Sequence, residues 1–189
     1  MHAILDEALI CHVAYVAAEG HPVVLPTIHG RIDDRLFLHG SVASAMLRAL
    51  RPGVECCVAA TVIDGLVLAR SAFHHSMNYR SVVVFGTATE VDDDDEKIAA
   101  MRAMTERLMP GRWADARPPA PRELAQTTVL TMPITEASAK IRTGPPIDDA
   151  EDLELPVWAG VLPLRVERGV PEPDPDLPAG RTVPPYLMS

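Results

Sequence analysis

Two adjacent histidines stand in the middle of the chain, in a segment dense with side chains that can bind a ligand or carry a proton. His74 and His75 precede Asn78, Tyr79 and Arg80 in the sequence FHHSMNYRS. A polar connection of this kind usually faces a ligand, so we expect the segment with His74 and His75 to do so, although a lone histidine is more often a hydrogen-bonded structural group. Consecutive residues of an extended chain point apart, which does not favour one metal ion bound by both.

Positive charge gathers in the same part of the chain. The 189-residue sequence carries a formal net charge of -9, which argues against nucleic acid and anionic membranes as partners. Between residues 35 and 88, however, five arginines stand against only two acidic residues. We expect this local excess to hold a small anionic ligand, with Arg80 or Arg48 as its anchor. An ion pair with Glu55 or Asp64 is the alternative, more so for Arg48 than for Arg80.

Strands must position these side chains, because apolar runs rich in Val, Thr and Ile dominate the first half of the chain. A hairpin turn is expected at residues 33 and 34, and a short helix is expected to begin at Ser41 or Ser44 and to stop at Pro52. A second turn is expected at residues 64 and 65, and a second helix after the four aspartates that end at Asp95. The expected strands cover residues 8–17, 23–29, 35–39, 54–63, 66–73, 79–91, 128–134, 137–141 and 157–166.

The composition fits one domain with a core of aliphatic side chains. Hydrophobic residues make up 48% and aromatic residues 4% of the sequence. No apolar run reaches the length of about 18 residues that a membrane span needs. Residues 1–168 are expected to form the domain, and the proline-rich residues 169–189 an extended tail.

Neither cysteines nor histidines show the spacing of a metal site. Cys11, Cys56 and Cys57 lie in strand-like runs without a C-x-x-C pattern, so we expect reduced cysteines in a cytoplasmic protein. His29 and His39 are expected on paired strands, but two histidines without a third ligand do not predict bound zinc.

Several segments resemble the pyridoxamine 5'-phosphate oxidase-like superfamily, and more narrowly its flavin-nucleotide-binding branch related to the nitroimidazole-resistance flavoproteins. They are HGSVAS at residues 39–44, DGLVLARS at 64–71, FHHSMNYRS at 73–81 and WAG at 158–160. The resemblance implies a mainly β fold, an FMN-binding split β-barrel of six or more antiparallel strands with two or more short helices. It also implies a homodimer with flavin at the subunit interface.

The resemblance places His74 and His75 beside the flavin, as candidate catalytic residues that donate a proton to a substrate or contact it. It further assigns candidate cofactor-binding residues. The strand before the first hairpin lines the flavin, the next strand end and the helix start hold its ring and phosphate, and Ser81 stands where the oxidases place a flavin-contacting glutamine. Two features of the oxidases are missing, a basic pair where this chain has Ser44 and Ala45, and a carboxyl-terminal substrate motif. Pyridoxamine phosphate oxidation is therefore not expected. The candidate cofactor-binding residues are Val24, Leu25, Pro26, Thr27, His39, Gly40, Ser41, Ser44, Asn78, Tyr79, Arg80 and Ser81.

The favoured function is that of an FMN-dependent oxidoreductase that passes electrons from reduced flavin to a small organic acceptor. One alternative is a haem-binding or haem-handling protein in which His39, His74 or His75 is an axial ligand. A second alternative is a non-catalytic module that stores or senses flavin.

Overall fold

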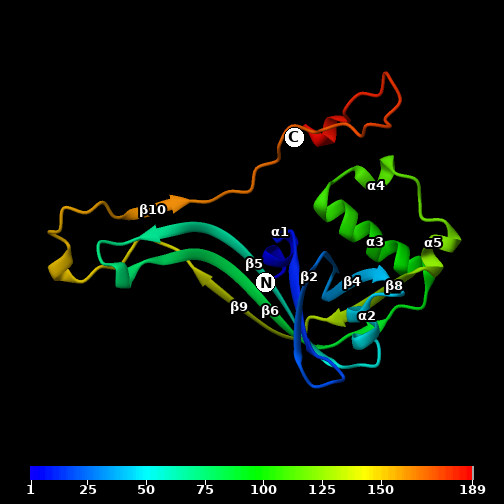
Figure 1. The fold of residues 1–189 in the computed structure, drawn as a ribbon, viewed down its shortest axis with the longest axis horizontal. Coiled ribbons are helices and arrows are strands. Elements are labelled where there is room, and N and C mark those ends of the chain that lie inside the picture. Colours follow the sequence, from blue (N-terminus) through cyan, green and yellow to red (C-terminus); the bar gives the residue numbers. More distant parts are fainter. Residues whose placement is uncertain (189) are drawn as a thin grey trace.

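The computed structural model describes residues 1–188, and Ser189, the last residue of the expected tail, lies outside the described residues. Two antiparallel sheets and a set of short helices form the body, from which a long hairpin projects (Figure 1). The expected mainly β fold with antiparallel strands and short helices is confirmed. Within residues 1–188, no helix is long and apolar enough to cross a membrane.

The large sheet has the strand order β2-β1-β5-β6-β9, and β10 pairs with β5 beyond the end of β1. All of its neighbouring strands run antiparallel. Alternate residues of β1 and β5 are buried, as expected for a sheet with one face on a core. Its strands are β1 (Cys11–Val16), β2 (Pro22–Thr27), β5 (Glu55–Leu68), β6 (Ser76–Thr87), β9 (Glu136–Arg142) and β10 (Gly160–Pro163).

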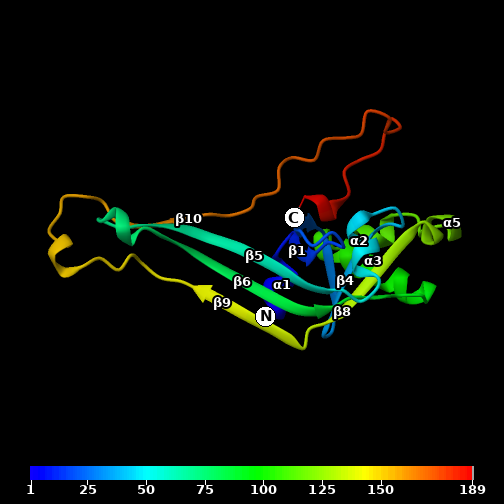
Figure 2. The ribbon, with the colours of Figure 1, turned by 60° about the horizontal axis from the view of Figure 1, so that its bottom comes forward.

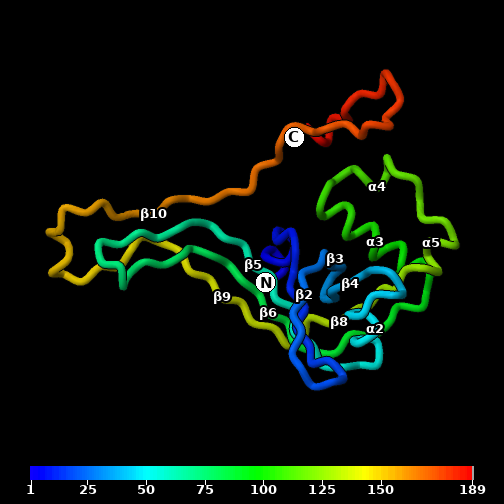
Figure 3. Tube along the Cα trace, viewed as in Figure 1, coloured from blue at the N-terminus to red at the C-terminus, as the bar shows by residue number. Residues whose placement is uncertain are grey.

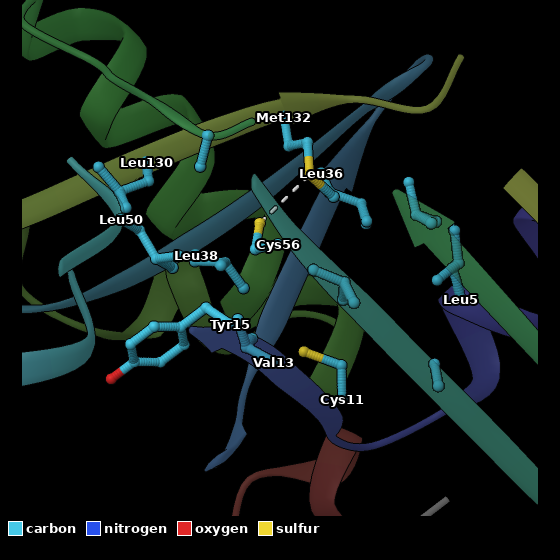
Figure 4. Packing of buried hydrophobic residues seen from close by; sticks show 14 of the residues in the cluster. Leu5, Cys11, Val13, Tyr15, Leu36, Leu38, Leu50, Cys56, Leu130 and Met132 are labelled. Carbon is cyan, nitrogen blue, oxygen red and sulfur yellow. Dashed lines mark hydrogen bonds between the residues drawn. The ribbon is translucent and has the colours of Figure 1, made fainter. Parts of the chain in front are cut away.

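The small sheet has the order β3-β4-β8-β7. The chain enters it from the large sheet twice, once through Ile28 and once through Ala88, so that the two sheets enclose one core. Figure 4 shows aliphatic side chains of both sheets meeting there, with the Cys56 thiol 3.8 Å from the sulfur of Met132. The strands are β3 (His29–Ile32), β4 (Arg35–Ser41), β7 (Thr89–Glu90) and β8 (Thr127–Pro133).

The two predicted helices begin at side-chain caps. Ser44 Oγ accepts from the Leu47 amide at 3.4 Å at the start of α2, and Asp93 Oδ1 accepts from the Glu96 amide at 2.8 Å at the start of α3. The expected hairpin turn at residues 33 and 34 is also confirmed. The helices are α1 (His2–Glu7), α2 (Ala45–Leu50), α3 (Asp94–Leu108), α4 (Arg112–Asp115), α5 (Pro121–Ala125) and the 3-10 turns η1 (Ala72–His74), η2 (Ala150–Asp152) and η3 (Pro185–Leu187).

Strands β5 and β6 form a hairpin, here called the arm, that extends well beyond the body (Figure 2). The turn expected at residues 64 and 65 is wrong, because β5 continues through it with only a bulge between Ile63 and Gly65. Gly65 serves a close approach instead, since a Cβ there would lie 2.9 Å from the carbonyl oxygen of Leu162 on β10. The hairpin closes at η1, and the strand expected at residues 66–73 is shorter, because β5 ends at Leu68 and residues 72 and 73 belong to η1.

The last residues return from the arm to the body (Figure 3). Arg168 Nη2 donates to the carbonyl oxygen of Leu108 at 3.2 Å, and the Tyr186 hydroxyl donates to Asp115 Oδ2 at 2.7 Å. These contacts join residues 168–188 to the ends of α3 and α4. The strand expected at residues 157–166 is shorter, because only Gly160–Pro163 pairs with β5.

Candidate functional site

One group of predicted residues gathers where the two sheets meet, and we call Thr27, His39, Gly40, Ser41 and Ser44 the body site. Thr27 ends β2, and His39, Gly40 and Ser41 end β4 just before α2. Gly40 allows α2 to pack closely, since a Cβ there would lie 3.1 Å from Leu47 Cδ1. The structure thus brings the predicted strand end and helix start together.

His39 is the half-buried imidazole of the body site. Its Nδ1 is buried and has no hydrogen-bond partner among the described residues. Burial lowers the pKa of His39, which keeps the ring neutral near pH 7. The ring lines a cavity of about 190 Å³ together with Ile28 and side chains of α3. His39 therefore keeps one nitrogen free for a ligand.

The start of α2 adds hydroxyl groups and one cation. Ser41 Oγ accepts from the Ala43 amide at 3.2 Å, which orders the turn before the helix. Arg48 lies one helical turn after Ser44, on the same face. Its side chain is exposed and forms no ion pair or side-chain hydrogen bond within residues 1–188. The ion pair considered for Arg48 is therefore absent from the described part of the chain.

The predicted strand residues Val24, Leu25 and Pro26 lie on β2, at one edge of the large sheet. All three are exposed, because β2 pairs only with β1. Val24 has 60% of its surface exposed, a large fraction for an aliphatic side chain on a sheet.

Arg80, the other expected anchor, already holds two carboxylates. Its Nε and Nη2 donate to Asp64 at 2.9 and 2.6 Å, and its other N–H groups donate to Glu7 on α1. The hydrogen bond from Arg80 lowers the pKa of Asp64 and of Glu7. The ion pair with Asp64 thus forms on Arg80 rather than on Arg48. Little hydrogen-bonding capacity remains on Arg80 for a phosphate.

The other predicted residues of β6 join the arm to β9. Buried Asn78 donates to the carbonyl oxygen of Gly144 at 3.1 Å and accepts from Arg142. The Lys140 ammonium lies 5.9 Å from the ring centroid of Tyr79. Ser81 Oγ donates to the Lys140 carbonyl at 3.5 Å. These contacts give Asn78, Tyr79 and Ser81 a structural role in the arm.

The two histidines at the end of the arm differ in the hydrogen-bond partners of their ring nitrogens. His75 Nδ1 accepts from the Ala69 amide at 3.0 Å, so the neutral ring carries its proton on Nε2. His74 Nε2 lies 3.2 Å from Asp149 Oδ2, which leaves Nδ1 with an unused lone pair when Nε2 is protonated. A carboxylate on one nitrogen fixes the orientation of an imidazole that binds a metal through the other. His74 is therefore better prepared than His75 to act as a ligand.

Two acidic residues that complete the arm end were missed by sequence reasoning. Asp148 Oδ1 accepts from the Arg70 amide at 2.8 Å, and Asp149 contacts His74. Both stand in a loop more than 70 residues further along the chain, and no spacing rule connects them with the arm. The nearby apolar side chains Phe73 and Trp158 are 88% and 68% exposed.

The body site and the arm end are far apart within one chain. Strand β6 alone has 12 residues, which corresponds to about 40 Å of extended chain. Figure 1 shows α2 and β4 in the body and the hairpin turn at the opposite end of the arm. His74 and His75 therefore do not face His39 of the same chain. His29 and His39 also lie apart, on opposite faces of their strands, and residues 1–188 contain no group of three metal-binding side chains.

The face of the large sheet that points away from the core is apolar, and we call it the outer face. One row across four strands consists of Val24, Ala14, Cys57 and Phe85, as the strand register shows. Phe85 is 45% exposed. Cys56 points the other way into the core, and all three cysteines are free, as predicted. This row of apolar side chains ends at Glu136 on β9, which pairs with Phe85.

A family model described as pyridoxamine 5'-phosphate oxidase matches residues 1–141. No curated protein sequence matches the chain. The flavocytochrome Anf3 from Azotobacter vinelandii is 40% identical over 99% of this chain and 86% of that chain, with a TM-score of 0.91. The FAD and haem binding protein from Mycobacterium smegmatis is 41% identical over 98% of this chain and 90% of that chain, with a TM-score of 0.92.

A more distant structure shows the shared fold. A Bacteroides thetaiotaomicron protein assigned to 5-nitroimidazole antibiotic resistance is 21% identical, over 73% of this chain and 80% of its own, with a TM-score of 0.62.

Proposed function

This chain belongs to the pyridoxamine 5'-phosphate oxidase family, with its split β-barrel fold, and from that membership we propose that it is a flavin-binding electron-transfer protein. The observation that carries the proposal is the chemistry of the body site. The turn after β4 and the start of α2 carry the hydroxyl groups of Ser41 and Ser44 and the exposed guanidinium of Arg48, which has no partner within residues 1–188, and His39 stands at the end of the same strand. When bound, the flavin supplies the redox chemistry.

The body-site residues would bind and orient the cofactor. Arg48 replaces the missing basic pair as the cation for the cofactor phosphate, because a guanidinium forms strong charge-assisted hydrogen bonds with phosphate oxygens. Ser41 and Ser44 donate hydroxyl hydrogen bonds beside it. His39, at the end of β4, borders the flavin, and the exposed apolar side chains of β2 cover a ring face. Arg80 stays in its pairs with Asp64 and Glu7.

The cofactor that we favour is FAD, although the sequence alone suggested FMN. The relative that is 41% identical is described as binding FAD and haem. This relative matches nearly the whole chain, so the cofactor in its description is a better guide than the cofactor of the superfamily as a whole.

The cofactor site would be shared between two copies of the chain. The apolar outer face suits a second copy, since a sheet face with Phe85 and Val24 exposed is stabilised when it is covered. A dimer would also bring the arm of one protomer to the body of the other. The homodimer implied by the sequence resemblance therefore stays part of the proposal.

Absorption spectra of the purified protein test flavin binding. Two broad flavin bands are expected, with release on heating of a compound that has the mass of FAD. Arg48→Ala should lower the flavin content at least about tenfold, the effect of losing one or two charge-assisted hydrogen bonds. Arg122→Ala removes an exposed arginine of α5 and should leave the content unchanged. A colourless protein after incubation with FAD and with FMN would refute the proposal.

A reduced nicotinamide cofactor then separates electron transfer from storage. Bleaching of the bound flavin, followed by recovery of its colour with a small organic acceptor, is expected for an electron-transfer protein. A flavin that no donor bleaches would instead indicate the storage module.

Sedimentation velocity tests the dimer. Phe85→Glu places a charge in the outer face and should give a monomer with reduced flavin content. Val170→Glu changes an aliphatic residue of the tail that is 89% exposed and serves as the control. A Phe85→Glu protein that remains dimeric would exclude this face as the interface.

Haem binding is a second candidate, favoured by the arm end. His74 is oriented by Asp149 and is accompanied by exposed Phe73 and Trp158, a combination that suits a planar apolar ligand with a metal centre. Both relatives at about 40% identity are described as a flavocytochrome or as haem binding. Bound haem would add a one-electron redox centre.

Addition of haemin tests this candidate. A Soret band shift is expected for the unchanged protein and for His75→Ala, and loss of the shift for His74→Ala. Loss of the Soret shift in His75→Ala alone would instead identify His75 as the haem ligand. No shift in any of the proteins would exclude haem.

A further inference from the structure

The cavity beside His39 is a separate feature of the body. It has a volume of about 190 Å³ and lies between the β2–β3 junction and α3. Four α3 side chains line it at positions that repeat along one helix face, with Ile28 and His39 opposite. The four are Met101, Met104, Thr105 and Leu108.

The position of α3 over this cavity is set by a glycine. A Cβ on Gly30 of β3 would lie 2.6 Å from Met104 Cγ, so only a glycine lets the helix approach this strand so closely. Methionine side chains adapt to ligands of different shape, because they are unbranched and polarisable. The close approach at Gly30 thus fixes the position of α3, whereas the side chain of Met101 can adapt to a ligand.

Of the two polar side chains that line the cavity, only His39 has no hydrogen bond within residues 1–188. Thr105 Oγ1 already donates to the Met101 carbonyl at 2.9 Å. His39 Nδ1, in contrast, is buried without a partner among residues 1–188. A buried polar atom without a partner is costly, and a ligand with one hydrogen-bonding group would remove this cost.

From this geometry we propose that the cavity binds a small single-ring phenol. An apolar cavity of about 150 Å³ is large enough for benzene, so about 190 Å³ accommodates one substituted ring. A phenolic hydroxyl both donates and accepts, and it therefore satisfies His39 Nδ1 in either neutral tautomer. A substrate role for the phenol rests on the proposed flavin function, since His39 belongs to the body site, whereas binding itself does not require flavin.

Phenol and toluene are matched probes, because a methyl group in toluene replaces the hydroxyl group of phenol. In the full chain with 13C-labelled methionine methyl groups, phenol is expected to shift the signals of Met101 and Met104 and to leave the core residue Met132 unchanged. Phenol should bind about tenfold more tightly than toluene, which corresponds to one hydrogen bond of about 1.4 kcal/mol. His39→Leu should remove this preference.

Two variants locate the binding. Met101→Phe fills the cavity and should abolish phenol binding, whereas Ala99→Phe adds the same ring on the exposed side of α3 and should not. Unchanged phenol binding by Met101→Phe, or equal affinity for phenol and toluene in the unchanged protein, would overturn the inference.

The two proposals fail separately. Flavin content is read from the absorption spectrum, and phenol binding from the methyl signals of the flavin-free protein. A protein that binds phenol but no flavin would refute the proposed function and leave the cavity site standing. A flavoprotein whose methionine signals do not change when phenol is added would refute the cavity site and leave the proposed function standing.

Discussion

Arg80 and Asp64 face each other across the arm, with Nη2 of the arginine 2.6 Å from Oδ1 of the aspartate. The same guanidinium holds Glu7, so this arginine also ties α1 to the arm. A residue that looked like a phosphate anchor in the sequence therefore joins two parts of the fold.

Replacement of Arg80 should affect stability and not flavin binding. Arg80→Ala is expected to lower the free energy of unfolding by about 1 kcal/mol, a modest effect because the paired side chains are partly exposed. Urea denaturation measures this change, and Arg80→Lys should recover part of it. Loss of flavin from a folded Arg80→Ala protein would instead show that Arg80 contributes to cofactor binding.

Acid should destabilise the protein through His29. Its Nε2 donates to the Leu5 carbonyl at 2.8 Å, and burial lowers the pKa of His29 from 6.5 to about 4. The unfolded state binds this proton more readily, so the stabilisation is complete above pH 6.5 and is lost progressively as the pH falls towards 4. The free energy of unfolding is expected to fall by up to about 3 kcal/mol over this window.

Denaturation at several pH values measures the effect of His29. His29→Gln keeps a donor for the Leu5 carbonyl but does not titrate, and its stability should change less between pH 7 and pH 4.5. Burial also lowers the pKa of His39, so its protonation in acid destabilises the folded protein as well. Equal pH dependence of the variant and the unchanged protein would contradict the assignment to His29.

An added methyl group at Gly30 should push α3 away from the small sheet. Gly30→Ala is expected to cost about 1–3 kcal/mol of unfolding free energy, because Met104 is buried and has little room to move. Gly169→Ala is the matched control, since a Cβ there meets nothing within 4 Å. Thermal unfolding compares the two, and a neutral Gly30→Ala would show that α3 shifts freely.

The sequence predicted elements whose signals are local. The cap at Ser44 and the aspartates at the start of α3 belong to the helices that they begin, and both helices are confirmed. Gly65 was misread as part of a turn, because the strand that demands a glycine there, β10, follows almost 100 residues later. Helix α1 was missed, since six residues without a side-chain cap give little periodic signal.

The candidate site was predicted residue by residue but not as an arrangement. The body-site residues follow one another closely in the sequence, and the structure keeps them together. Whether Arg48 or Arg80 remains free depended on Glu7 and Asp64, and the contact between Arg80 and Glu7 spans 73 positions of the sequence. No pattern within a short window contains such a partner.

Two of the three edge strands of the large sheet, β2 and β9, resist extension by another strand. Pro22 and Pro26 leave β2 with an incomplete set of N–H donors, and β9 ends the sheet on the other side with Glu136, Lys140 and Arg142 among its seven residues. Pairing of copies of the chain through β2 or β9 into a continuous ribbon is therefore disfavoured, whereas contact through sheet faces is not. The same prolines and charges that limit pairing should keep concentrated solutions free of fibrous aggregates.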